Sequence, residues 1–599
     1  MTVQSPLADV GPESVGASGI RFRQLDFTTQ ADCADAPLTW AQEHMLGLIR
    51  ALEPLTQPVN LGYHIALREG VSPDEVIAGL DDLMRSHEAL RTTYLDTEAG
   101  PQQRIANSGS LTVAIVECDE QVGEKTASAV HAALADRAFD LAAEWPIRVG
   151  VVTGGGEPRY LAFALCHLFL DTTGARWINY HLRSLLSHVF AEERAPRIPN
   201  PMRVQAQWES SPTGTRHGSR GVAQHLRTFG AMPQTMLPRP LQEVPAPRYR
   251  YLEFTSPALA VAVPFLAAHH DTSPATVLFG AIAGVSGFVS TLPRAYLQLT
   301  VGNRIEPRVR NAVGMYTQDV PVEVDLTDAS VADVIDRATP VVLQAARFGM
   351  HPPLELEAAR RRIEARRGIH FDLSCWLNFV PMARLARTAE RPNASVLAQA
   401  RADTRWRWVE GTDNSTSTYF VFADGNAQAM VLTLIVDCAV LAPQEAVAWV
   451  HAIEAVLCES TARDVAVAEF GAYTDLSRDP RGDGWCLTDA NWVRLPDVAD
   501  LVRGVSGSPR AEVFAVPSAE GERLRAFIPA GSAVPDLAEL HAACVARLAE
   551  SPLRTAMAPH EYVVCSGPAR GSDAAGWERL PVLAAGTGRT DGDATIPEA

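Results

Sequence analysis

A histidine and an aspartate four residues apart follow a continuously apolar stretch of the chain. Residues 160–166 read YLAFALC, His167 comes next, and Asp171 precedes a run of small residues. An uninterrupted apolar run of this length is typical of a strand buried on both faces. A histidine where such a strand opens can accept a proton from an attacking amine or hydroxyl, or hold that nucleophile in position. The Asp171 carboxylate can pair with a cation and hold the loop so that the imidazole points into a cleft.

The spacing alone leaves a second interpretation open, because H-x-x-x-D also occurs where the histidine is purely structural. Three other polar clusters favour structural or solvent-exposed roles over catalysis. His269-His270-Asp271 precedes a helix start and is expected in solvent, and Asp413-Asn414 is typical of a turn. The arginines at 360–362 and 366–367 indicate a solvated helix face, with a patch for an acidic carrier protein as the alternative.

Helices and strands must position the histidine, and their patterns alternate along the chain in two successive units. In the first unit, alternation at Tyr63, Ile65 and Leu67 precedes a helix that Ser72 caps and Pro73 begins. The pattern predicts an α/β (α+β) protein. The predicted boundaries are a flexible tail at 1–34, a first lobe at 35–190, an interlobe connection at 191–247, a second lobe at 248–470, a small α+β domain at 480–582 and a disordered tail at 583–599.

The composition excludes several classes of function. The chain has 599 residues with 52 basic and 70 acidic side chains, and its net charge of −18 disfavours binding to nucleic acid or to anionic membranes. Its nine cysteines are scattered without a C-x-x-C pair, so we expect neither disulfides nor a metal site. Lys125 is the only lysine, which argues against lysine chemistry. With no signal pattern and no apolar stretch of ~18 residues, we expect a cytoplasmic protein without a membrane span.

Several motifs, in order along the chain, resemble those of nonribosomal peptide synthetase condensation domains, which belong to the superfamily of chloramphenicol-acetyltransferase-like acyltransferases. The family signature H-H-x-x-x-D-G is similar to Cys166-His167-x-x-x-Asp171-Thr172. The other matching elements are PLTWAQE at 37–43, RSHEALRT at 85–92, GNR at 302–304, VGMYTQ at 313–318, RFGMHPP at 347–353 and WLNF at 376–379. The resemblance implies two lobes in a V with an active-site tunnel between them.

The same resemblance implies roles for individual residues. His167 would be the catalytic histidine, and Asp171 a structural aspartate in a salt bridge with the arginine that matches Arg91, since a buried carboxylate needs such a partner. Cys166 replaces the family's first histidine and Thr172 its glycine, and Gln318 replaces an asparagine. No covalent acyl-enzyme is implied, so Cys166 is not expected to be a nucleophile. The remaining motif neighbours are Thr173 and Gly174, and candidates for the tunnel wall are Asn378 and Tyr316.

The C-terminal region resembles a second family, the small C-terminal subdomain of adenylation (acyl-AMP-forming) enzymes. The similar segments are GW at 484–485, VFAV at 513–516, LRAFI at 524–528 and DLAELHAACVARLAE at 536–550. That family ends near a lysine that drives adenylation, whereas the nearest segment here, Gly576–Arg579, has none. The chain also lacks a Gly-rich phosphate loop of the G-x-x-x-x-G-K type. We therefore expect no ATP-dependent activation, and a structural or docking role for this degenerate unit.

The expected function is amide formation in nonribosomal peptide or antibiotic biosynthesis by a free-standing enzyme. An acyl or peptidyl carrier protein in trans would supply the thioester on its phosphopantetheine arm, and a small-molecule or carrier-bound amine would attack it. Holding both substrates in opposed channels would supply proximity and orientation. No bound cofactor or metal is expected. The alternatives are an ester product, an acyl-CoA donor, or a non-catalytic recruitment module, which the Cys166 and Thr172 changes motivate.

Overall fold

The computed structural model describes most of the chain and divides it into two compact units. The described residues are 5–30, 33–53, 59–98, 100–119, 123–187, 201–380, 388, 390–519, 521–531, 534–550, 554–569 and 573–589. Unit 1 takes the described residues up to Gly221 together with Gly302–Gln318 and Ala346–Pro353, and unit 2 takes the rest. The predicted second lobe is therefore interrupted, because two of its segments belong to unit 1. The predicted connection at 191–247 contains two helices, and the unit boundary falls inside the second of them.

Unit 1 is built on a five-stranded sheet of order β1-β6-β7-β8-β3 and a three-stranded sheet of order β2-β5-β4. Strand β8 pairs with β7 on one side and with β3 on the other. Its residues 161–165 are completely buried, which explains their uninterrupted apolar sequence. The strands are β1 (Gly19–Thr28), β2 (Ala34–Pro37), β3 (Leu61–Ala66), β4 (Thr92–Thr97), β5 (Gly100–Ile105), β6 (Ser108–Cys118), β7 (Ile147–Gly154) and β8 (Glu157–Leu165).

The helices of unit 1 begin where the sequence supplies caps. Thr39 and Ser72 both form capping boxes, and Pro73 is the first helical residue of α2, as predicted. The helices are α1 (Trp40–Ala51), α2 (Pro73–Ser86), α3 (Gly123–Ala135), α4 (Thr172–Leu186), α5 (Met202–Glu209) and the part of α6 (Pro212–Ala231) up to Gly221, with short 3-10 turns at Pro6–Ala8, Pro12–Val15 and Glu88–Arg91.

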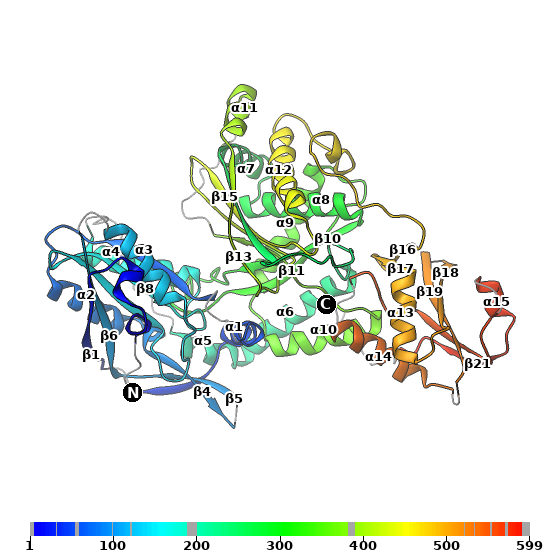
Figure 1. The fold of residues 1–599 in the computed structure, drawn as a ribbon, viewed down its shortest axis with the longest axis horizontal. Coiled ribbons are helices and arrows are strands. Elements are labelled where there is room, and N and C mark those ends of the chain that lie inside the picture. The colour runs from blue at the N-terminus through cyan, green and yellow to red at the C-terminus, as the bar shows by residue number, and fades with distance from the viewer. Residues whose placement is uncertain are drawn as a thin grey trace. The chain divides into compact units, whose positions relative to one another are not determined.

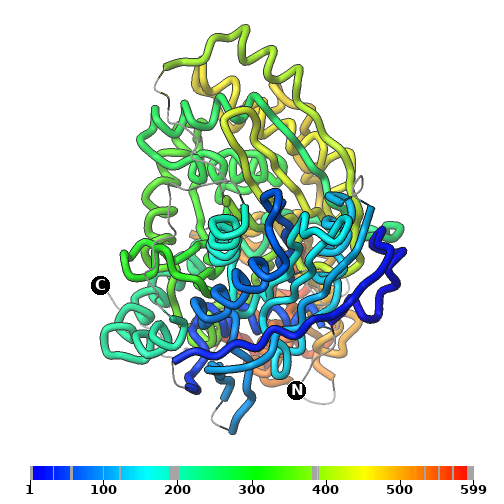
Figure 2. The backbone as a smooth tube through the Cα atoms, turned by 90° about the vertical axis from the view of Figure 1, so that its left-hand side faces the viewer, coloured from blue at the N-terminus to red at the C-terminus, as the bar shows by residue number. Residues whose placement is uncertain are grey.

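The prediction of a flexible tail at 1–34 is wrong for most of that segment. Strand β1 pairs with β6 in antiparallel register from Gly19↔Glu117 to Thr28↔Ser108. Figure 2 shows this dark blue strand running beside the other strands of unit 1. Leu25 and Phe27 point into the core and Ile20 packs against it, so a few apolar residues hold a segment that is rich in charged and polar side chains.

Unit 2 contains a seven-stranded mixed sheet of order β11-β10-β12-β14-β15-β9-β13. Helices α7, α8 and α12 pack on one face of it (Figure 1). The strands are β9 (Tyr249–Ser256), β10 (Arg294–Val301), β11 (Gln318–Asp325), β12 (Cys375–Phe379), β13 (Arg405–Thr412), β14 (Tyr419–Gly425) and β15 (Met430–Asp437). The helices are α7 (Pro257–His269), α8 (Pro274–Ser290), α9 (Val331–Phe348), α10 (Pro353–Arg367), α11 (Ala394–Ala402) and α12 (Pro443–Ser460), with a 3-10 turn at Val467–Ala472.

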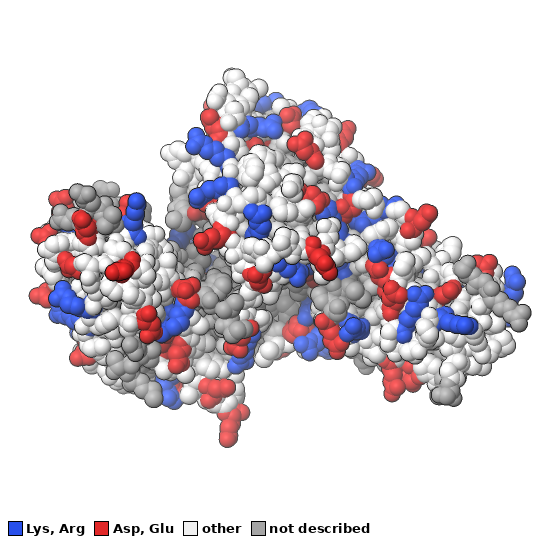
Figure 3. Space-filling model, in the orientation of Figure 1, with Lys and Arg blue, Asp and Glu red and all other residues white. Residues whose placement is uncertain are grey.

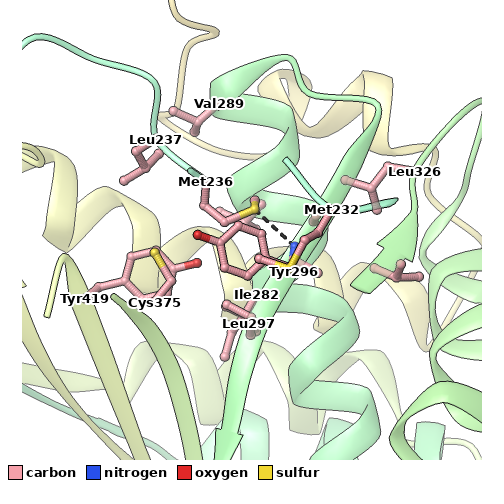
Figure 4. Close-up of a cluster of buried hydrophobic side chains, with 14 of the residues drawn as sticks. Met232, Met236, Leu237, Ile282, Val289, Tyr296, Leu297, Leu326, Cys375 and Tyr419 are labelled. Carbon is pink, nitrogen blue, oxygen red and sulfur yellow. Dashed lines mark hydrogen bonds between the residues drawn. The ribbon is translucent and has the colours of Figure 1, made fainter. Parts of the chain in front are cut away.

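The core of unit 2 lies between the sheet and these helices. Figure 4 shows part of it, where Tyr419 and Cys375 come from neighbouring strands and Ile282 comes from α8. Tyr419 is fully buried, and its hydroxyl forms a 3.0 Å hydrogen bond with the Ser286 hydroxyl of α8. This contact fixes which face of β14 is turned toward the helices.

The C-terminal region adds a four-stranded sheet of order β18-β19-β20-β21 and a hairpin. It begins near the boundary that the sequence predicts, but it belongs to unit 2 and shares the hydrophobic core of that unit. The elements are β16 (Trp485–Thr488), β17 (Asn491–Arg494), α13 (Leu495–Ser506), β18 (Glu512–Ser518), β19 (Gly521–Pro529), α14 (Leu537–Glu550), β20 (Glu561–Cys565), α15 (Ala574–Glu578) and β21 (Val582–Gly586). The predicted disordered tail at 583–599 is therefore wrong up to Gly586, and residues 590–599 lie outside the described residues.

Arg367 joins the C-terminal region to the rest of unit 2. Its guanidinium donates to the carbonyl oxygens of Phe229 and Met232 at 2.9 and 2.7 Å and pairs with Asp489 at 3.1 Å. Arg589 in turn donates to the Arg367 carbonyl oxygen at 3.3 Å. Arg367 is only 7% exposed, so the prediction that the arginine run is a solvated face is wrong at this residue.

The rest of the arginine run is partly neutralised by its own helix. Arg360 pairs with Glu357 and Glu364, and Arg361 also pairs with Glu357. Figure 3 shows acidic and basic side chains interspersed over the visible face of the molecule. These observations do not favour the alternative of a concentrated basic patch for a carrier protein on this helix.

Among the described residues, no single helix is long and apolar enough to cross a membrane. Helices α7 and α8 meet the length and composition test only as a pair bent by 104°.

His560 should make the C-terminal region sensitive to acid. Its Nδ1 accepts the Leu524 backbone N–H at 3.0 Å, and burial, together with Arg589 and Arg523, lowers its pKa to about 4. Because the unfolded chain binds this proton near pH 6.5, stability should fall by about 3 kcal/mol as the pH drops from 6.5 to 4.

The substitution His560→Asn tests this, because the asparagine Oδ1 replaces the accepting nitrogen without titrating. We expect the variant to lose that part of the pH dependence in urea unfolding measured at pH 4 and at pH 7. An equal loss of stability with acid in both proteins would assign the sensitivity to other groups.

Candidate functional site

The candidate histidine lies where the sequence predicts, at the end of a buried strand. Strand β8 ends at Leu165, and His167 lies half-buried in the turn that follows. The Cys166 carbonyl oxygen accepts the N–H groups of Phe169 and Leu170, both at 3.2 Å, which closes the turn. Helix α4 then begins at Thr172. The central strand and the closed turn together fix the backbone that carries the imidazole.

Asp171 stabilises this turn and the start of α4. It is the N-cap residue of α4, and its Oδ1 accepts the Gly174 backbone N–H at 2.7 Å. Its Oδ2 accepts the Tyr316 N–H at 3.0 Å and the Thr317 hydroxyl at 3.1 Å. Asp171 is 1% exposed, so a charge here requires compensation.

Arg304 provides that compensation. Its two terminal nitrogens lie 2.5 Å from Oδ2 and 2.8 Å from Oδ1 of Asp171, a bidentate arrangement. Burial alone would raise the pKa of Asp171, but the charge and hydrogen bonds of Arg304 and the N–H donors of Gly174 and Tyr316 hold it below its ordinary value. Asp171 is therefore a structural carboxylate that stays ionised.

The predicted ion pair between Asp171 and Arg91 is wrong. Arg91 is buried, but one terminal nitrogen donates to the Ala106 carbonyl oxygen at 2.6 Å and the other lies 3.9 Å from Glu88. Arg91 therefore supports the 3-10 turn after α2 and not the histidine loop. The sequence resemblance supplied an arginine for Asp171 but assigned it to the wrong motif.

The correct partner was visible in the sequence as the third residue of Gly302-Asn303-Arg304. Asn303 adopts a positive φ of 52°, and its side chain donates to the Tyr316 carbonyl oxygen at 2.9 Å. Arg304 also donates to the carbonyl oxygens of Ala312 and Gly314 at 3.3 and 3.2 Å. This loop turns back on itself and presents Arg304 to Asp171, which spacing alone does not reveal.

The glycine at 174 allows two backbone segments to approach closely. A Cβ at this position would lie 3.0 Å from the Gly314 carbonyl oxygen and 3.1 Å from its nitrogen. Thr172 and Thr173 are the first residues of α4 and are half-buried. Although Thr172 replaces a glycine of the family signature, the close contact that needs a glycine in this chain is at Gly174.

The two candidates for the tunnel wall lie in different units. Tyr316 belongs to unit 1 and is 2% exposed, and its ring lies 4.8 Å from the Arg304 guanidinium in a small buried cluster with Met202 and Val309. It is therefore a packing residue, and its assignment to the tunnel wall is wrong. Asn378 is half-buried on β12 in unit 2, and its role stays a prediction.

The other clusters singled out in the sequence have structural partners. His270 Nδ1 lies 2.8 Å from Asp336, and His269 stacks on Phe265. The Asp413 side chain accepts the Arg248 backbone N–H at 2.8 Å. Within the described ranges, no group of three or more histidine, cysteine or acidic side chains could hold a metal ion.

Cys166 should not react as a nucleophile. It is 2% exposed in the core of unit 1, and burial raises the pKa of its thiol to about 12, so little thiolate exists near neutrality. We expect Cys166→Ala to keep activity within about threefold of the parent while losing about 1 kcal/mol of stability from the small cavity. The measurement is amide formation before and after iodoacetamide treatment. If iodoacetamide inactivates the parent, substrate prevents this, and the Cys166→Ala variant is not inactivated, then Cys166 takes part in the reaction and this prediction is wrong.

Comparisons with known proteins show which families of sequence and fold the chain is similar to. Residues 33–367 match the family model described as the condensation domain. The chain is 27% identical over 335 residues to the probable non-canonical nonribosomal peptide synthetase CymA of Salinispora arenicola, covering 53% of this chain and 4% of that protein. It is 26% identical over 349 residues to the isonitrile lipopeptide synthase of Mycobacterium tuberculosis, covering 55% of this chain and 14% of that protein. The chain thus spans a small fraction of the curated relatives that it matches.

Solved structures show the same fold at low sequence identity. The condensation domain of the monacolin K polyketide synthase MokA has a TM-score of 0.55 at 13% identity, covering 72% of this chain and 98% of that chain. The X-domain in complex with OxyB from teicoplanin biosynthesis has a TM-score of 0.53 at 15% identity, covering 74% of this chain and 96% of that chain.

Proposed function

The chain belongs to the condensation-domain family, and on that premise we propose that it joins an acyl or aminoacyl thioester to an amine. The observation that carries the proposal is the histidine loop. His167 follows the buried strand β8, and the ionised, fully buried Asp171 is held by Arg304 and caps the next helix. The mixed α/β class is confirmed, and solved condensation domains share the fold of this chain.

In the proposed reaction, the amine nitrogen attacks the thioester carbonyl carbon. The C–N bond forms, the C–S bond breaks, and the proton lost by the amine ends on the departing thiol. The His167 imidazole accepts that proton or holds the amine for attack, and both roles need a ring fixed at the strand end. Neither step requires a covalent bond to the protein, which agrees with the buried, protonated Cys166 thiol.

Family membership also indicates how the acyl group arrives, because condensation domains act on substrates bound to carrier proteins. We propose that the donor of this chain is carried on a phosphopantetheine arm by a separate carrier protein. The C-terminal region has no lysine and is built into unit 2, so we assign it a structural role and no activation chemistry.

The test is product formation, measured by mass spectrometry with a panel of acyl-carrier thioesters and amine acceptors. A new amide that depends on the protein, together with release of the free carrier thiol, is the expected result. An amide formed from acyl-CoA without any carrier would replace the carrier proposal with a CoA-dependent transferase. An ester formed with hydroxyl acceptors would change the acceptor class.

A non-catalytic recruitment role is the second candidate. One observation favours it, because a protein of the same fold, the X-domain, was solved in complex with OxyB. The Cys166 and Thr172 departures from the signature point the same way. No product with the pathway's own carriers, combined with binding of a partner enzyme to this chain, would move this candidate ahead.

A further inference from the structure

One cross-strand row on the large sheet of unit 2 combines flat rings with two polar atoms that lack partners. We call the residues Gln298, Trp376, Phe420, Ile435 and Tyr251 the aromatic row. They are direct neighbours on five successive strands, in the registers Gln298↔Trp376, Trp376↔Phe420, Phe420↔Ile435 and Ile435↔Tyr251. Direct cross-strand neighbours point to the same face of a sheet, so the five side chains form one surface.

This surface lies on the side of the sheet opposite to the core helices. Tyr419 and Cys375 are completely buried on the helix side, and Tyr419 bonds to Ser286 of α8. Successive residues of a strand alternate between faces, so Phe420 and Trp376 point the other way. Both are half-buried, and their rings stack with centroids 6.0 Å apart and planes 28° apart.

The polar end of the row contains an acceptor and a donor without hydrogen-bond partners. Gln298 is 7% exposed, and its Oε1 is buried with no donor. The Nε1–H of Trp376, on the adjacent strand, is also buried and has no acceptor. Leaving a buried polar atom unsatisfied is costly, and each such atom in a folded protein calls for an explanation. Here an unsatisfied acceptor and an unsatisfied donor lie on neighbouring strands, so one ligand that has both a donor and an acceptor can bond to both atoms.

We propose that the aromatic row binds a substrate group with a flat ring and a neighbouring secondary or primary amide. The amide N–H donates to Gln298 Oε1, its carbonyl oxygen accepts from Trp376 Nε1, and the ring stacks beside Phe420. Because Gln298 and Trp376 lie on adjacent strands, which are about 4.8 Å apart, a single small ligand can contact both side chains. This inference rests on the proposed function and narrows its substrate class to aromatic residues that carry an amide.

The same chemistry occurs in either substrate, so binding is measured for both by calorimetry, without turnover. The donor probe is the N-acetylphenylalanyl thioester of pantetheine, and the acceptor probe is phenylalaninamide. The 3-phenylpropionyl thioester of pantetheine keeps the ring and thioester but loses the added amide, and the N-acetylleucyl thioester keeps the amide but loses the ring. For the acceptor probe, 2-phenylethylamine lacks the amide and leucinamide lacks the ring. We expect at least one amide-and-ring probe to bind about tenfold more tightly than its two matched analogues.

Two substitutions remove the polar atoms while keeping shape, Gln298→Met and Trp376→Phe. Each should weaken the amide-and-ring probe about five- to tenfold and leave the 3-phenylpropionyl thioester unaffected. Gln298→Met should also raise the urea midpoint of the free protein, because it removes an unsatisfied buried atom. A gain in stability with a loss of affinity is a combination that a purely structural glutamine would not give. Trp408→Phe on the edge strand β13 is the matched control. It should leave the binding affinity of the amide-and-ring probe and of the 3-phenylpropionyl thioester unchanged.

The outcomes separate this inference from the proposed function. Equal binding of the probes with and without the added amide, or no effect of either substitution, would overturn the aromatic-row site and indicate a bridging water at the two atoms. A clear binding preference without any amide product would instead overturn the proposed function and leave the site intact.

Discussion

Replacement of His167 by alanine is expected to slow amide formation by about 10²–10⁴-fold, the contribution typical of a positioned acid–base group. The ring lies in the turn after β8, and its backbone is fixed by hydrogen bonds to Cys166 and by the capped start of α4. Removing the side chain therefore deletes the imidazole without disturbing the strand that carries it. The measurement is the single-turnover rate of product formation with saturating donor and acceptor.

The control for this prediction is His64→Ala, which removes an imidazole from the neighbouring strand β3. His64 pairs in register with Ala162 of β8 and forms a 3.0 Å hydrogen bond with His131, away from the histidine loop. The control should lose stability while keeping the rate within about threefold. Equal rates for His167→Ala and the parent enzyme would remove His167 from the reaction and favour the recruitment role.

The strand, the turn and the helix around His167 could be predicted from the sequence because each carries a local signal. The uninterrupted apolar run at 161–165 is typical of a strand buried on both faces, and Asp171 followed by small residues is a recognisable helix start. The ion partner of Asp171 carries no local signal. Arg91 and Arg304 both lie in segments that resemble motifs of the family, and only the folded path of the 302–318 loop decides between them.

The errors at the two ends of the chain have a related cause. Strand β1 places Leu25, Phe27 and the partly buried Ile20 against the core among charged and polar neighbours, so its composition resembles that of a loose tail. Its order comes from backbone pairing with β6, which side-chain composition does not encode. In the same way, Arg367 belongs to a run of exposed arginines in the sequence, and only the packing of the C-terminal region buries it.

Breaking the ion pair between Asp171 and Arg304 is expected to have the largest effect on stability. Arg304→Met leaves a fully buried carboxylate with backbone and hydroxyl donors but no countercharge, which should cost about 3–5 kcal/mol at pH 7. In the parent protein the pKa of Asp171 is lowered, so the stabilisation it gives is present above pH 3.8 and is lost as the pH falls through the folded-state pKa. Without Arg304, burial raises that pKa, and the penalty should grow as the pH rises above 3.8.

A double-mutant cycle decides which arginine holds the loop. Asp171→Asn combined with Arg304→Met should recover part of the loss, with a coupling energy of about 1–3 kcal/mol in urea unfolding. Asp171→Asn combined with Arg91→Met should be additive within about 0.5 kcal/mol, since Arg91 bonds to Ala106 and not to Asp171. The opposite result, coupling through Arg91 and additivity through Arg304, would mean that the 302–318 loop does not close over Asp171 in solution. His167 would then be held by a different network, and its alignment would depend on the turn after α2.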